Sequence, residues 1–191
     1  MKRFKGRRGG RATAVMEQGE ARLLAGLAAQ VAELLAEGTP SAEPTVDDPL
    51  EQLLDFDGPV HAPEDPVLQR LLPDAYRDDE AAAADFRRYT ERGLRETKIA
   101  NARAVIDSLV DGGMAEGEPV EDSVEVDLNP EQVQAWLRTL TDVRLALATR
   151  LGIEDDEHLW DSDSDDPAAV MHDVYDWLGF VQETLVLAID N

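Results

Sequence analysis

Apolar residues recur mainly at helical spacing along this chain, which predicts a helical protein. In the first third, apolar residues recur at helical spacing and share one face of a helix: Leu24, Leu27, Val31, Leu34 and Leu35. Similar patterns occur further along. We predict helices over residues 18–37, 49–56, 66–72, 78–111, 130–151 and 167–189.

Four Asx-Pro pairs mark helix starts. The Asx side chain can accept hydrogen bonds from the first free backbone N–H groups, and proline fits the first helical position because its missing N–H would have had no partner. Glycine after the periodic segments predicts the helix ends, at Gly38, Gly112-Gly113 and Gly152. The four pairs are Asp48-Pro49, Asp65-Pro66, Asn129-Pro130 and Asp166-Pro167.

The longest predicted helix, over 78–111, has one face made of two aromatic residues followed by small ones. Small side chains let helix backbones approach closely, so we expect a neighbouring helix to pack against this face. Its residues are Phe86, Tyr89, Gly93, Thr97, Ala100 and Ala104.

Strand patterns are few and predict only a small sheet. In "SVEVDL" (123–128) apolar and polar residues alternate, as in a half-buried strand. The opening segment reads as a hairpin, with Phe4 in one arm, Thr13 and Val15 in the other, and Gly9-Gly10 near the turn.

The predicted fold is therefore mainly α: a six-helix, bundle-like domain with a small antiparallel sheet formed by the N-terminal hairpin and one central strand. A length of 191 residues suits a single domain. Within it we distinguish a basic hairpin (1–16), a helical half (17–113) and a half with one strand and two helices (121–191).

Composition narrows the possible functions. The chain has no cysteine, which excludes disulfides, thiolate nucleophiles, thiol switches and Cys-ligated zinc. No secretory signal is visible, and the longest apolar region is too short to cross a bilayer. We therefore expect a cytoplasmic protein.

Charge is distributed unevenly. The net charge is −23, yet residues 1–11 hold six of the 18 Lys and Arg residues and no acid. This segment could neutralise phosphates or an acidic partner. Alternatively, it could be a charged sheet edge that pairs with the acidic body and prevents aggregation. The candidate contact residues here are Lys2, Arg3, Lys5, Arg7, Arg8 and Arg11.

A second basic group lies on the long helix. Arg88, Arg92 and Arg95 follow i, i+4, i+7 spacing and share one face. They either pair with carboxylates of neighbouring elements or form a docking face for an acidic partner or a nucleic-acid backbone. The acidic body argues against unaided DNA binding.

No motif for catalysis or metal binding is present. The segment 161–172 resembles a calcium loop in its first positions, but Asp166 replaces the required glycine and His172 the required glutamate. We expect His61, His158 and His172 to be surface residues. No nucleophile elbow or phosphate-binding loop occurs. We therefore predict no enzyme activity, no cofactor and no metal.

Three segments carry a resemblance to a known family: "DPVLQRLLPDAY", "WLRTLTDVRLALATRLGI" and "YDWLGFVQETL". Together with the basic start, they make nearly the whole chain similar to an actinobacterial family, formerly a domain of unknown function, named for the oxidative-stress transcriptional regulator AosR. The resemblance implies a role in stress-linked transcription through contact with a sigma factor or RNA polymerase. It also implies redox response by thiol-disulfide switching, which a chain without cysteine cannot perform.

The expected function is a non-enzymatic regulator that acts through protein–protein contact. Two alternatives remain open from the sequence: an adaptor or accessory protein in regulated proteolysis, and a helical domain that binds a small molecule. The oligomeric state does not follow from the sequence.

Overall fold

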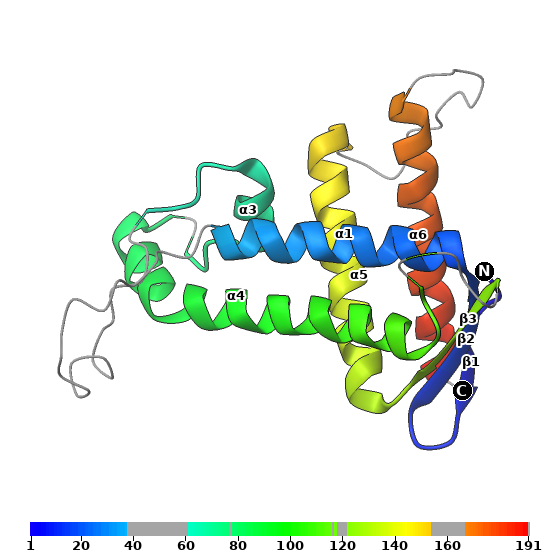
Figure 1. The fold of residues 1–191 in the computed structure, drawn as a ribbon. Coiled ribbons are helices and arrows are strands. Elements are labelled where there is room, and N and C mark those ends of the chain that lie inside the picture. The colour runs from blue at the N-terminus through cyan, green and yellow to red at the C-terminus, as the bar shows by residue number, and fades with distance from the viewer. Residues whose placement is uncertain (38–60, 77, 116, 118–121, 154–166, 191) are drawn as a thin grey trace.

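The computed structural model describes residues 1–37, 61–76, 78–115, 117, 122–153 and 167–190. In this part of the chain it contains five helices and one small antiparallel sheet (Figure 1), so the mainly helical class is confirmed. The predicted helix at 49–56 lies outside the described residues. The helices are α1 (Gln18–Glu37), α3 (Pro66–Leu71), α4 (Glu80–Asp111), α5 (Pro130–Leu151) and α6 (Pro167–Ile189).

Side-chain caps begin the helices as predicted at two of the Asx-Pro pairs. Asp65 accepts a hydrogen bond from the backbone N–H of Val67 at 2.7 Å. Asn129 and Gln132 form a reciprocal capping box at the start of α5. At its other end α5 stops at Gly152, whose φ of 69° suits glycine far better than other residues.

The sheet has the strand order β1-β2-β3, and both pairings are antiparallel. The strands are β1 (Lys5–Arg7), β2 (Arg11–Glu17) and β3 (Ser123–Leu128). The face of β2 that is turned to the core carries Ala12, Ala14 and Met16, while Thr13 and Val15 are only partly buried. Phe4 lies just before β1 rather than within it.

The core lies between the sheet and the helices α1, α3, α4, α5 and α6. α1 and α4 run alongside each other, α5 and α6 cross them, and the sheet closes one end of the molecule (Figure 1). Trp136 of α5 is fully buried in this core. Its ring meets Phe4 edge-on at 5.6 Å between centroids, and its indole N–H donates to the hydroxyl of Ser108 at 2.9 Å.

The expected packing face of α4 is exposed, so that expectation was wrong for the described part of the chain. Phe86 and Tyr89 are 45% and 60% exposed. α4 turns the opposite face to α1 and α5, and in its first half that face buries Arg87, Glu91 and Arg95. Hydrophobicity alone misjudged the orientation because these buried residues are charged: Arg95 pairs with Glu91 at 2.7 Å, and Arg87 pairs with Asp74 at 2.5 Å.

Candidate protein-interaction surface

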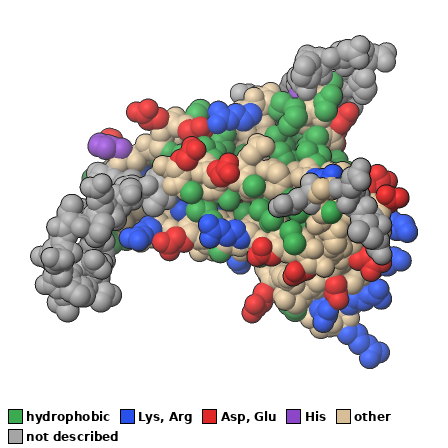
Figure 2. All heavy atoms as spheres, in the orientation of Figure 1, with side chains coloured by type: hydrophobic (Ala, Val, Ile, Leu, Met, Phe, Trp, Pro, Cys, Tyr) green, Lys and Arg blue, Asp and Glu red, His purple; other side chains and the backbone are tan. Residues whose placement is uncertain are grey.

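The basic hairpin, defined here as residues 2–11, presents its cations to solvent. Lys2, Arg3, Lys5, Arg7, Arg8 and Arg11 are all exposed. β1 and β2 are joined through Arg8, Gly9 and Gly10, and both glycines have positive φ, 78° and 73°, a conformation that side chains disfavour. Figure 2 shows blue Lys and Arg side chains gathered at the lower right, where Figure 1 places the hairpin.

The register brings like charges together on the outer face of the sheet. Arg7 lies directly opposite Arg11 across the β1–β2 pair, an arrangement that disfavours the sheet. Two contacts offset the repulsion: Arg11 pairs with Asp127 of β3 at 2.7 Å, and Arg7 donates to the Thr13 hydroxyl at 3.2 Å. The alternation of "SVEVDL" could have identified Asp127 as an outward acid beside the hairpin.

Local contacts hold this hairpin against the body. A Cβ built on Gly6 would lie 2.1 Å from the backbone oxygen of Ala188, so β1 approaches the end of α6 as closely as glycine permits. The N-terminal amino group pairs with Glu20, and the backbone N–H of Lys2 donates to the oxygen of Val15 at 2.8 Å. The hairpin is therefore a preformed surface.

The second basic group does not form the shared exposed face predicted from its spacing. Arg95 is 3% exposed, and it donates to the Leu35 backbone oxygen and to Glu91, both at 2.8 Å. Arg95 is therefore paired inside the protein, and it is excluded as a surface contact. Arg88 is half-buried. Arg92 is exposed and pairs with Glu96 at 3.2 Å.

The two basic groups also lie far apart. The end of α4 touches β3, where the backbone N–H of Glu125 donates to the oxygen of Gly112 at 2.9 Å. Arg92 is 20 residues before Gly112, which corresponds to about 30 Å along a helix. Arg88 and Arg92 therefore belong to a different surface from the hairpin (Figure 1).

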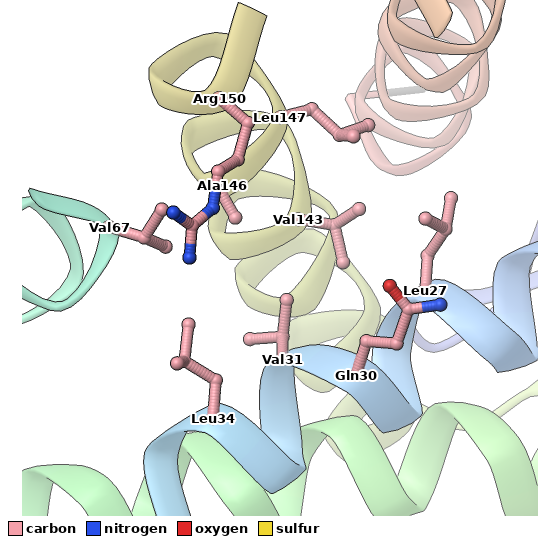
Figure 3. Close-up of a pocket in the computed structure, with 9 residues that line it drawn as sticks. All are labelled: Leu27, Gln30, Val31, Leu34, Val67, Val143, Ala146, Leu147 and Arg150. Atoms are coloured by element: carbon pink, nitrogen blue, oxygen red, sulfur yellow. The ribbon is translucent and has the colours of Figure 1, made fainter. Parts of the chain in front are cut away.

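A hollow of about 250 Å³ lies between α1, α3 and α5. Seven apolar residues line it, together with Gln30 and Arg150 (Figure 3). Arg150 extends from α5 towards the space between α3 and α1, and it pairs with Asp65 at 2.8 Å. Partial burial tends to raise the pKa of Asp65, but hydrogen bonds from Val67 and Arg150 outweigh it and lower that pKa. The apolar lining residues are Leu27, Val31, Leu34, Val67, Val143, Ala146 and Leu147.

One carboxyl in the interior has a raised pKa. Asp142 of α5 is 5% exposed and pairs with the Lys98 ammonium of α4 at 2.5 Å. Burial raises the pKa of Asp142, and the hydrogen bond and charge of Lys98 oppose the rise. The pair joins α4 and α5 within the core.

Metal sites are absent from the described part of the chain, where no three His, Asp or Glu residues converge. The first half of the acidic segment 161–172, and His158 with it, lies outside the described residues. His61 is exposed as expected, but His172 is buried in α6, so its assignment to the surface was wrong. None of the described helices has the length and hydrophobicity needed to cross a membrane.

Comparison with known proteins finds relatives along the full chain. A sequence profile for a domain of unknown function, DUF2017, matches residues 1–189. The oxidative stress regulator AosR of Mycobacterium tuberculosis is 32% identical over 98% of this chain and 86% of its own length. A protein of the same name from Mycobacterium bovis matches equally well. No solved structure matches the chain significantly.

Proposed function

The chain belongs to the DUF2017 family, which includes the oxidative stress regulator AosR, and we propose that it is itself a non-enzymatic regulator of stress-linked transcription. In this role its basic hairpin binds an acidic surface of a sigma factor or of RNA polymerase. The relatives' name supports the regulatory role, because the similarity covers 98% of this chain.

We assign the contact site to the hairpin because exposed cations are concentrated there on an otherwise acidic protein. The hairpin holds Arg7 and Arg11 opposite each other, and two contacts offset their repulsion. Because a chain of net charge −23 repels anionic partners at long range, the hairpin is the surface best suited to meet one. The contact should therefore weaken as salt screens it.

Oxidant sensing in this role comes from outside the chain. These 191 residues contain no cysteine, so no thiol switch can form in them. The hairpin would then engage a partner whose own state or abundance responds to stress.

Affinity capture with two charge-matched variants tests the proposal. Lys5 and Arg8 form no ion pair with the other described residues, so Lys5→Gln with Arg8→Gln should leave the fold intact. Arg70→Gln with Arg138→Gln removes the same charge from two exposed helical sites. We expect RNA polymerase subunits or a sigma factor to be captured by wild type and by the second variant, and lost by the first.

Two results would overturn the proposal. Recovery of no transcription component by the wild type would contradict the role in transcription. Equal recovery by both variants, with circular dichroism confirming that both fold, would contradict the hairpin as the contact site.

The apolar hollow favours a second candidate function, binding of a small amphipathic molecule. Its lining is apolar apart from Gln30 and Arg150, a pattern suited to an aliphatic chain with an anionic head. Octanoate serves as the probe. It should raise the melting temperature of wild type but not of Ala146→Phe, whose side chain fills the hollow. An unchanged melting temperature in wild type would exclude this candidate.

A further inference from the structure

The outward face of α4 is a surface with exposed aromatic residues. Phe86 and Tyr89 expose 45% and 60% of their surface, and Gly93, Thr97 and Ala100 continue the same face and are also exposed. Neighbouring aromatic rings exposed on one face are typical of protein-binding surfaces. α1 and α5 pack on the opposite side of α4.

We propose that this face binds the same face of a second copy of the chain, with the two α4 helices antiparallel and a two-fold axis at the level of Leu94. The inference is independent of the regulatory role proposed above. A homodimer is expected because the face is complementary to itself in both size and charge.

Size complementarity follows from the order of residues along the helix. The bulky rings lie in the first half of the face and the small residues in the second. In an antiparallel pair, residues equally far from Leu94 in opposite directions meet. Phe86 then inserts between Ala100 and Ala104 of the second copy, while Gly93 meets the Gly93–Thr97 region, where the backbones approach most closely. A parallel pair would instead place ring against ring and leave the small residues apart.

Charge complementarity gives the same register. Asp85 and Arg103 lie nine residues on either side of Leu94, and Arg92 and Glu96 lie two residues on either side. All four are exposed, and at about 100° per residue they fall on one flank of the helix. Each acid of one copy therefore faces a base of the other, and the two-fold axis repeats both pairs.

This flank adds little to the general repulsion between two acidic molecules. The four named residues balance, two acids against two bases, although Asp107 is also exposed beside them and the whole chain carries −23. A contact of a single helix pair is small for a stable dimer, and the net charges oppose it. We therefore expect a dimer in the micromolar range that strengthens, rather than weakens, with moderate salt, because exposed ion pairs contribute little.

Gly93→Leu is the central test, measured by sedimentation velocity of the full chain across micromolar concentrations. A Cβ at Gly93 meets nothing within 4 Å in the single chain, so leucine should preserve the fold while holding two helices apart. Gly26→Leu is the matched control, since Gly26 is an exposed glycine within α1 that is equally unobstructed. We expect wild type and Gly26→Leu to dimerise, and Gly93→Leu to be at least tenfold weaker.

A charge swap tests the register. Arg103→Glu should weaken the dimer by repelling Asp85, and adding Asp85→Arg should restore it at the original net charge. Because the chain has no cysteine, single cysteines give a second measurement. Gly93→Cys should cross-link under mild oxidation, whereas Ala104→Cys residues would lie about 30 Å apart in the antiparallel pair and should not.

The proposal fails if the wild type is monomeric at every concentration, or if Gly93→Leu dimerises like the wild type. It also fails if both cysteine variants cross-link, because that result indicates a parallel pair of helices. A monomeric wild type that loses its captured partner in Gly93→Leu would assign the face to a different protein. Loss of partner capture in the hairpin variant alone would leave the dimer unaffected, so the two proposals fail separately.

Discussion

Replacing Glu91 by alanine should destabilise the protein strongly, because Glu91 compensates a buried cation. Glu91 and Arg95 are each 3% exposed, and the Arg95 Nη2 atom lies 2.7 Å from the Glu91 carboxylate. The Arg87 guanidinium lies 4.0 Å from the other carboxylate oxygen. Among the described residues, Glu91→Ala leaves Arg95 with the Leu35 backbone oxygen as its hydrogen-bond partner and with no ion pair.

The expected loss is about 3–5 kcal/mol, the usual cost of breaking a buried ion pair from one side. For a chain of this size each kcal/mol lowers the melting temperature by about 2–4 °C, so the total shift is about 6–20 °C. A second, exposed ion pair on α4 serves as the control. Glu96 pairs with Arg92 at the same i,i+4 spacing but is 68% exposed, so Glu96→Ala should cost about 0.5 kcal/mol or less.

Urea denaturation followed by circular dichroism measures both variants under identical conditions. Costs within about 1 kcal/mol of each other would refute the claim that burial makes the Glu91–Arg95 pair different. A further variant distinguishes the loss of the Glu91–Arg95 attraction from the cost of leaving Arg95 buried without a counter-charge. Glu91→Leu combined with Arg95→Met should be more stable than Glu91→Ala alone, since no uncompensated charge remains at Arg95.

Three other predictions concern the frame of the fold. Gly6→Ala should cost about 1–3 kcal/mol, because its Cβ would lie 2.1 Å from the Ala188 oxygen, whereas Gly19→Ala, with nothing within 4 Å, should cost nothing in thermal denaturation. Trp136→Phe should lose about 1–3 kcal/mol through the missing hydrogen bond to Ser108, and an unchanged urea midpoint would contradict this. For Asp142, the pKa is raised above its ordinary 3.8 in the folded protein, so the folded state holds this proton more tightly. Wild type should therefore gain stability relative to Asp142→Asn as pH falls through the raised pKa towards 3.8, and a pH-independent difference would count against it.

The sequence predicted the helices of the described region well because their limits are encoded locally. Asn129 followed by Pro130, with Gln132 three residues on, specifies a capped start wherever the helix packs. Gly152 adopts the left-handed conformation that ends α5. The alternation in 123–128 likewise sets which side of β3 is buried. Such signals need no knowledge of neighbours.

The orientation of α4 could not be predicted in this way, because it depends on partners distant in sequence. Arg95 is buried since the Leu35 oxygen, 60 residues earlier, and Glu91 satisfy it. Helical periodicity weighs a charged residue as outward and an aromatic one as inward. In α4 both assignments are reversed, and consequently Arg95 was taken as a contact residue and Phe86 as part of a face packed against a neighbouring helix.

The hairpin shows how a basic surface can coexist with an acidic chain. Phe4 is anchored on Trp136, and Gly6 fits against α6, so the strands are held whether or not their charges are paired. Arg11 is neutralised within the sheet by Asp127, while Lys5 and Arg8 extend from a fixed backbone towards solvent. A preformed surface avoids the entropic cost of ordering on binding. In the proposed role the hairpin is therefore always competent to bind, and regulation follows from the partner that presents an acidic surface to it.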